Sequence, residues 1–201
     1  MKRLLFASLI FAVGCTTTQM DESAAPAEGT SPRIGEAHQQ LIETYSAGDT
    51  EYSGFYNNFE FKATMINSAV RDGLVRKTGL YYQWDNEKLQ AEREKANAKM
   101  QQETEVFLSF YTPDRRNDNL SETKAIWRVY LEAGGQRYQG KVKRLRSLLA
   151  ELQALYPYHT RWNTAYEVSF PVPTTAIETQ KATLTVTGPL GTRNVVFNTV
   201  K

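Results

Sequence analysis

Hydrophobic and polar residues alternate along several short segments of the chain. The alternation covers residues 59–65, 127–131, 166–170 and 183–187, and residues 106–111 are apolar on both faces. Successive side chains of a strand point to opposite faces of a sheet, so a period of two predicts half-buried β-strands. The two-sided segment predicts a strand that is buried on both faces.

Turns built on glycine separate some of these strands. Gly134 and Gly135 follow the strand at 127–131, and residues 188–191, Gly-Pro-Leu-Gly, lead into a last strand over residues 194–200. This closing threonine-rich hairpin resembles the last two strands of immunoglobulin-like sandwiches. The likeness concerns the fold alone.

Two longer segments have apolar residues at helical spacing. Residues 85–103 predict a mostly charged helix with one narrow apolar stripe, which either packs on the protein's own sheet or binds a partner. Residues 142–155 predict an amphipathic helix with a leucine stripe, ending before Pro157. Both helices are therefore expected to cover a surface of the domain.

Two shorter helices are expected earlier in the chain. The first covers residues 34–46 and ends at the break formed by Gly48 and Asp49. The second is a short helical turn capped by Asn67, whose length Gly73 and Gly79 limit.

Strands in short antiparallel order with inserted helices predict an α+β fold. The most plausible architecture is an antiparallel β-sandwich or sheet decorated with two or three helices, because the chain lacks the regular rhythm of a parallel βαβ sheet. Residues 34–201 are long enough for a single globular domain that buries about two-thirds of its unfolded surface.

The N-terminus has the pattern of an export signal. Lys2 and Arg3 precede an apolar run over residues 4–13, which is too short to span a bilayer. The residues Ala-Val-Gly-Cys at 12–15 resemble the lipobox of bacterial lipoproteins. Cys15 is the single cysteine of the chain, so it cannot form an internal disulfide.

The resemblance implies cleavage after residue 14 and acylation of Cys15, which would contact membrane lipid. Ala12 departs from the family pattern, which most often has leucine there, and the alternative is an ordinary secretory signal followed by a stray cysteine. Thr16 stands where the lipoprotein sorting rule places aspartate for inner-membrane retention, so the resemblance implies outer-membrane delivery, with the domain on the periplasmic face. Residues 15–33 are expected to be the lipidated cysteine and a flexible tether, because they are small, polar and poor in apolar side chains.

The charge balance excludes a general attraction to nucleic acid. Loss of residues 1–14 removes Lys2 and Arg3, which lowers the basic count from 24 to 22 against 22 acidic residues. A nearly neutral mature chain has no global field for a polyanion.

The chain carries no recognisable catalytic, metal or nucleotide motif. The two histidines, His38 and His159, are far apart in the sequence and have no metal-ligand spacing. Nucleophile-elbow, phosphate-loop and Ser-x-x-Lys motifs do not occur. We therefore expect no cofactor and no enzymatic activity, and we expect His159 to pack or cap rather than to act as a general base.

Acidic residues leave two alternatives open. A cell-wall or glycan hydrolase would use a carboxylate pair, for which the candidates are Glu51, Glu60, Asp114 and Glu167. Oxygen ligands in the loop at 114–119 could bind calcium, although a solvated loop is the expectation because two arginines interrupt them.

A local basic excess is the remaining candidate site. It consists of Arg137, Lys141, Lys143, Arg144 and Arg146. On the expected helix most of these side chains lie opposite the leucine stripe, where they either contact lipid phosphates and acidic cell-wall groups or form a solvated face.

Aromatic residues are also dense in this part of the chain. They could stack on sugars, but their alternation along strands favours core packing. They are Trp127, Tyr130, Tyr156, Tyr158, Trp162 and Tyr166.

These observations predict an outer-membrane lipoprotein whose periplasm-facing domain binds or scaffolds envelope components, either protein or cell-wall polymer, without catalysis. A glycan hydrolase is the rival, and it requires a cleft that holds two acidic groups. A small-ligand binder is the third class, and it requires a closed apolar pocket between sheet and helix.

Overall fold

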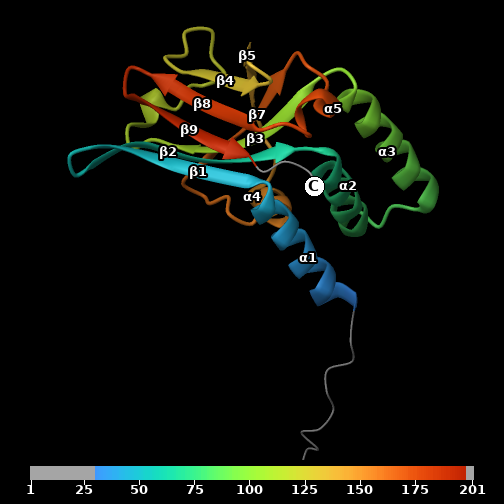
Figure 1. The fold of residues 1–201 in the computed structure, drawn as a ribbon. Helices are drawn as coiled ribbons and strands as arrows, with labels where there is room; N and C mark the ends of the chain where they lie inside the picture. Colours follow the sequence, from blue (N-terminus) through green and yellow to red (C-terminus); the bar gives the residue numbers. More distant parts are fainter. Residues whose placement is uncertain (1–29, 198–201) are drawn as a thin grey trace, which may run out of the picture.

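The computed structural model describes residues 30–197, with side chains from residue 35 onward. The signal segment, Cys15 and most of the expected tether lie outside the described residues. Within them the fold is α+β, as predicted, and consists of two antiparallel sheets with helices along one side (Figure 1). No helix in residues 30–197 is long and apolar enough to cross a membrane.

The larger sheet has five strands. Their order in the sheet is β1 (Ser46–Ser53), β2 (Tyr56–Ile66), β3 (Thr104–Tyr111), β7 (Thr164–Phe170) and β6 (Lys141–Arg144). The smaller sheet has four strands, in the order β5 (Gln136–Gln139), β4 (Arg128–Ala133), β8 (Ala182–Gly188) and β9 (Gly191–Phe197). All neighbouring strands are antiparallel.

The main hydrophobic core lies between the two sheets. Alternate residues of β2, β3 and β7 point into it and meet those of β4, β8 and β9. Trp127 is buried in this core, with its ring edge-on to Phe59 at 4.8 Å and to Phe110 at 5.1 Å between centroids. The Trp127 indole also donates a hydrogen bond to the carbonyl of Asn117 at 2.6 Å, so its one polar group is satisfied.

The sheets are connected along both edges. On one edge the chain passes from β5 into β6 through Gly140, whose N–H donates to the carbonyl of Val129 at 2.8 Å. A side chain at Gly140 would lie 2.4 Å from a Val168 methyl carbon, so only glycine fits this corner. On the other edge β1 meets β9, where Arg193 lies 2.9 Å from Glu51.

The helices cover the outer face of the five-stranded sheet. They are α1 (Thr30–Thr44), α2 (Ser68–Tyr81), α3 (Asn86–Met100) and α4 (Leu149–Leu155), with a short α5 (Thr174–Ile177) and a 3-10 turn η1 (Arg115–Asn117) elsewhere. A second apolar cluster joins α1, α2 and α4 to the sheet around Phe107. The expected β-sandwich therefore carries a third, helical layer.

Several predicted elements are confirmed, with their caps. The Asn67 side chain accepts from the N–H of Val70 at 2.9 Å and begins α2, and Asp85 accepts from the N–H of Lys88 at 2.8 Å and begins α3. The strands expected at 59–65, 106–111, 127–131, 166–170 and 183–187 are β2, β3, β4, β7 and β8. The last strand begins earlier than expected, at Gly191.

Two sequence predictions about glycine are wrong. Gly73 and Gly79 do not limit α2, which continues through both to Tyr81. They instead allow close packing, because a side chain at Gly73 would lie 2.5 Å from a Leu41 methyl carbon. Gly48 does not break the chain but lies within β1, opposite Lys62.

The helix predicted over residues 142–155 is wrong in its first half. Lys141–Arg144 form strand β6, and helix α4 begins only at Leu149. The half-buried Val142 packs against the inter-sheet core, opposite Val168 of β7 in the register. Pairing of this segment with β7 has overridden the helical spacing of its leucines.

The C-terminal boundary predicted for the tether, residue 33, is also wrong, because α1 begins at Thr30.

Candidate functional site

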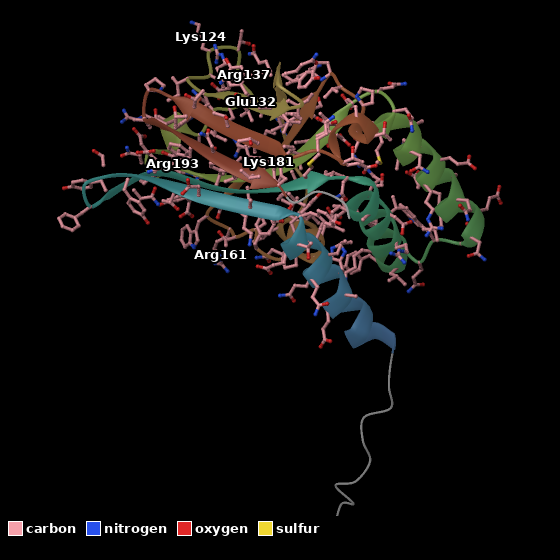
Figure 2. The ribbon with its side chains drawn as sticks, in the orientation of Figure 1. Lys124, Glu132, Arg137, Arg161, Lys181 and Arg193 are labelled. Carbon is pink, nitrogen blue, oxygen red and sulfur yellow. The ribbon has the colours of Figure 1, made fainter. Side chains whose placement is uncertain are left out.

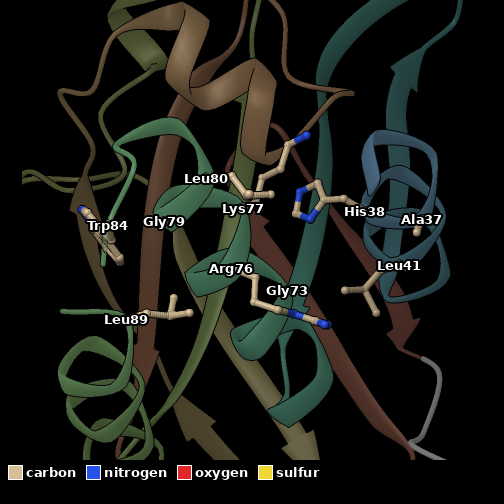
Figure 3. Close-up of a pocket in the computed structure, with 10 residues that line it drawn as sticks. All are labelled: Ala37, His38, Leu41, Gly73, Arg76, Lys77, Gly79, Leu80, Trp84 and Leu89. Carbon is tan, nitrogen blue, oxygen red and sulfur yellow. The ribbon is translucent and has the colours of Figure 1, made fainter. Parts of the chain in front are cut away.

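A groove of about 410 Å³ lies on the outer surface of the helical layer (Figure 3). Its floor is one face of α2, formed by Gly73, Arg76, Lys77 and Leu80, which are three, four and seven positions apart. One wall comes from α1 and the other from the turn into α3. The remaining lining residues are Ala37, His38, Leu41, Gly79, Trp84 and Leu89.

The two glycines of α2 determine the depth of this groove. Beside Gly73 the Leu41 side chain approaches the α2 backbone directly. A side chain at Gly79 would lie 3.1 Å from a Leu89 methyl carbon and 3.3 Å from the Trp84 ring. Larger residues at either position would fill the floor, so the glycines keep the apolar walls accessible.

His38 supplies the groove with a buried polar atom that has no partner. Its side chain is 6% exposed, and its Nε2 lies 2.9 Å from the carbonyl of Leu155. A carbonyl only accepts, so Nε2 carries the hydrogen and Nδ1 is left as an acceptor. Nδ1 is buried without a hydrogen-bond partner among the described residues. Figure 3 shows the ring pointing from α1 toward α2.

The electrostatic environment keeps the His38 ring neutral. Burial lowers the pKa of His38, and the nearby charge of Lys77 lowers it further, against the opposing effect of the Leu155 carbonyl. A neutral ring retains the free lone pair at Nδ1. The wall of the groove therefore contains a buried hydrogen-bond acceptor, which has no partner among the described residues.

Two cations stand at the edge of the groove. Arg76 lies 3.0 Å from Asp72, and the same carboxylate lies 3.1 Å from Arg93. Lys77 lies 5.2 Å from the centre of the Tyr81 ring, and no carboxylate within residues 35–197 pairs with it. The single carboxylate of Asp72 thus pairs with both Arg76 and Arg93, and the ammonium group of Lys77 has no carboxylate partner in the described part of the chain. The rim of the groove is therefore positively charged.

The five basic residues singled out in the sequence do not form one surface. Arg137 lies on β5, 3.3 Å from Glu132 and stacked over the ring of Tyr130. Because residues 141–144 form a strand, Lys141 and Lys143 lie on one face and Arg144 on the other. Arg146 is exposed in the segment between β6 and α4. The sequence predicted that these residues share one face of a helix, and this prediction is wrong because residues 141–144 form strand β6.

His159 forms a buried pair with a serine. Its Nδ1 lies 2.9 Å from the Ser109 hydroxyl, its ring lies edge-on to Phe107, and burial lowers its pKa. Ser109 and His159 are only 1% and 3% exposed. The pair connects the loop after α4 to the sheet.

The candidate carboxylates lie in different environments. Glu51 is 2.9 Å from Arg193, Glu167 is 3.6 Å from Lys99, and Asp114 is 2.8 Å from Arg116. Glu60 accepts a long hydrogen bond from Asn57 at 3.5 Å. Three of the four are therefore neutralised by a cation.

The loop considered for calcium has a structural role. Asp118 accepts hydrogen bonds from the hydroxyls of Tyr166, at 2.8 Å, and Thr164. In the described part of the chain, no group of three or more His, Cys, Asp or Glu side chains is arranged to hold a metal ion.

The aromatic residues mostly lie in the interior. Trp127, Tyr156 and Tyr166 are buried, as their alternation predicted. Trp162 is the exception, with 68% of its surface exposed.

The narrow apolar stripe predicted on α3 packs largely on α2, where Leu89 approaches Gly79, and Met100 is buried.

Comparison with protein-family models, with curated proteins and with solved structures gave no match. The class of the protein therefore rests on its own geometry. It is a two-sheet α+β domain with a helical layer, and that layer carries a ligand-sized apolar groove.

Sequence reasoning missed this groove. It treated Gly73 and Gly79 as helix limits and His38 as an isolated residue. The available signal was a pair of glycines inside a segment that is otherwise helical, which indicates close packing against that helix.

Proposed function

We propose that this chain is an outer-membrane lipoprotein, anchored through acylated Cys15, whose domain binds an anionic amphiphile of the cell envelope in the groove over α2. The observation that carries the proposal is the unpartnered Nδ1 of His38 inside an apolar groove. The lipobox-like residues 12–15 support the anchor.

The size and lining of the groove fit a small molecule. Ligand sites typically enclose about 300–1,000 Å³, with apolar walls and a few placed polar groups. Leu41, Leu80 and Leu89 supply apolar surface, and the Trp84 ring supplies an aromatic face. These walls would remove a hydrocarbon or ring system from water.

The polar groups define the rest of the ligand. A buried acceptor without a partner costs about 1–3 kcal/mol, so a ligand that donates to His38 Nδ1 recovers that cost on binding. Lys77 then complements a carboxylate, sulfonate or phosphate at the open end. The ligand class is therefore an amphiphile with a hydrogen-bond donor near its apolar part and an acidic group at one end.

The lining supports binding rather than catalysis. It contains one titratable acceptor, His38, and two cations, Arg76 and Lys77, but no carboxylate, serine or cysteine. A hydrolytic mechanism needs a nucleophile or an acid and base pair in reach of the substrate. This groove offers recognition groups only.

Anilinonaphthalene sulfonate (ANS) is a suitable probe, because it combines a ring system, an N–H donor and a sulfonate. We expect the Cys15→Ser chain to bind ANS with energy transfer from its tryptophans, of which Trp84 lines the groove. Leu80→Asp should weaken binding, because Leu80 lines the groove, and with 55% of its surface exposed we expect the variant to fold. Val196→Asp on β9 is the matched control, at 47% exposure. Equal affinity of wild type and Leu80→Asp would overturn the binding proposal.

The anchor is tested separately in cells. Cys15→Ser should make the protein extractable from the membrane fraction by salt, without detergent, because stable anchoring depends on the acyl chains. A protein that remains extractable only by detergent after this substitution contradicts acylation of Cys15. The groove assay uses unacylated protein, so the two parts of the proposal can fail independently.

A further inference from the structure

A second hollow, of about 280 Å³, lies between β7, the loop after α4 and the segment before it. Three arginines from separate parts of the chain surround it: Arg115 from η1, Arg144 from the end of β6, and Arg161 from the loop that precedes β7. Figure 2 shows Arg161 at the side of the molecule away from Lys124 and Arg137. None of its lining residues belongs to the groove over α2.

The fold holds one of these arginines in place. Arg115 donates to the carbonyl of Trp162 at 2.9 Å, and its guanidinium lies 3.4 Å from Asp118. Asp118 is itself fixed by the hydroxyl of Tyr166. Arg115 therefore keeps its orientation toward the loop, and its charge is paired with that of Asp118.

The other two arginines have no such partner. Within residues 35–197, neither Arg144 nor Arg161 forms an ion pair, and both are exposed. Only one of the three guanidinium groups, that of Arg115, is paired with a carboxylate, so the hollow has a local positive excess. Arginine binds phosphate oxygens in a bidentate manner, and this arrangement suits a phosphate ester.

Neutral polar groups add donors to the same hollow. They are the hydroxyls of Ser147 and Thr160 and the amide of Asn163. Around a tetrahedral anion such groups supply hydrogen bonds between the arginines.

Exposed apolar side chains stand beside these cations. Leu148 is 72% exposed, Trp162 is 68% exposed, and Leu149 is 36% exposed. Tryptophan is enriched at the level of lipid headgroups, and leucine inserts below it. A free anion would leave this apolar surface in water, whereas a bilayer would cover it while presenting phosphates to the arginines.

We propose that this surface, formed by Arg115, Arg144, Arg161, Leu148, Leu149 and Trp162, docks on an anionic bilayer, with a lipid phosphate in the hollow. We call it the arginine–tryptophan surface. The inference rests on the position of these cations and exposed apolar side chains around one concave site. It requires neither the anchor nor the groove over α2.

The test is co-sedimentation of the Cys15→Ser chain with vesicles. We expect pelleting with vesicles that contain phosphatidylglycerol and little with phosphatidylcholine alone. Arg144→Gln combined with Arg161→Gln should reduce vesicle affinity roughly 30-fold, since each cation near a charged membrane contributes about one factor of five. Trp162→Phe should remove the blue shift of tryptophan fluorescence on vesicles, because Trp127 is buried and Trp84 lines the groove over α2 rather than this surface.

Lys124→Gln combined with Lys181→Gln is the matched control, because it removes the same charge beside the four-stranded sheet (Figure 2). It should leave vesicle affinity nearly unchanged. An equal loss in the control pair would show general attraction and overturn the proposal. Tight binding of inorganic phosphate by a protein that does not pellet with anionic vesicles would also overturn it.

Discussion

The rings of Phe107 and Tyr156 lie parallel, with centroids 3.6 Å apart and planes 2° from parallel. Phe107 belongs to β3 and Tyr156 follows α4, so this pair attaches the helix and its following loop to the sheet. Both side chains are buried in the second apolar cluster. The Phe107–Tyr156 pair is therefore one of the contacts that hold the helical layer on the outer face of the sheet.

We predict that Phe107→Ala lowers the free energy of unfolding by about 3–5 kcal/mol, because it removes a buried ring and leaves a cavity. Urea unfolding measures the change. Phe55→Ala is the control, because Phe55 is fully exposed at the tip of the β1–β2 hairpin and should change stability by less than about 0.5 kcal/mol. Similar effects of the two substitutions would contradict the packing seen around Phe107.

Glu105 of β3 provides a second attachment of the helical layer. Its buried carboxylate accepts hydrogen bonds from Arg71 of α2 and Lys99 at the end of α3. Burial raises its pKa, but the charges and hydrogen bonds of Arg71 and Lys99 outweigh burial and hold the pKa of Glu105 below its usual value of 4.5. The carboxylate is therefore ionised in the folded protein at neutral pH.

We predict that Glu105→Gln costs about 3–5 kcal/mol at neutral pH, because it leaves two cations without their buried partner. In the unfolded chain the carboxyl titrates near 4.5, so its contribution is complete above that pH and is lost as the pH falls through the lower folded value. Urea unfolding from pH 7 to pH 3 should show a steeper acid loss in wild type than in Glu105→Gln. Parallel pH profiles would contradict this assignment.

The buried histidine next to Ser109 gives a different pH window. Burial lowers the pKa of His159 below its usual value of 6.5, so the unfolded chain binds the proton first as the pH falls. Stability should therefore decrease as the pH falls below about 6.5. We predict that His159→Asn removes part of this slope and leaves ANS binding intact. Loss of ligand binding in a stably folded variant would instead give His159 a functional role.

The strands that sequence reasoning found are those whose alternation matches burial. Phe59, Phe61 and Met65 all point into the inter-sheet core, so their period of two reports directly on the fold. Strand β1 lacks this signal, because it is an edge strand of small and polar residues, and its Ser46 hydroxyl bonds Thr64 rather than entering the core. The alternation of apolar and polar residues reveals a strand only where one face of the strand is buried, and the edge strand β1 buries few side chains.

The failures around residues 141–155 and in the groove have a common physical cause. Val142 occupies a position compatible with both a leucine stripe and a strand, and only pairing with Val168 decides between them. The groove joins His38, Gly73 and Leu89, which come from three elements. Their proximity follows from how α1 and α3 pack on α2, and single-sequence periodicity contains no such information.

Gly73 lies where α1 packs on α2 and also lines the groove, so a substitution there separates effects on stability from effects on ligand binding. In Gly73→Ala the new methyl carbon would meet a Leu41 methyl carbon at 2.5 Å, and because that atom ends a flexible side chain, Leu41 can move. Leu41 also lines the groove, so we expect a shift of its side chain to change the shape of the groove. Alanine also favours a helix by about 0.5–1 kcal/mol, so we expect little net change in stability.

We predict that Gly73→Ala weakens ANS binding about ten-fold, which corresponds to about 1.4 kcal/mol lost as Leu41 narrows the groove. Gly35→Ala in α1 is the matched control, because a side chain there has nothing within 4 Å. It should stabilise the helix equally and leave ANS affinity unchanged. Fluorescence titration beside urea unfolding separates the two effects, and unchanged affinity in Gly73→Ala would place the ligand outside the groove over α2.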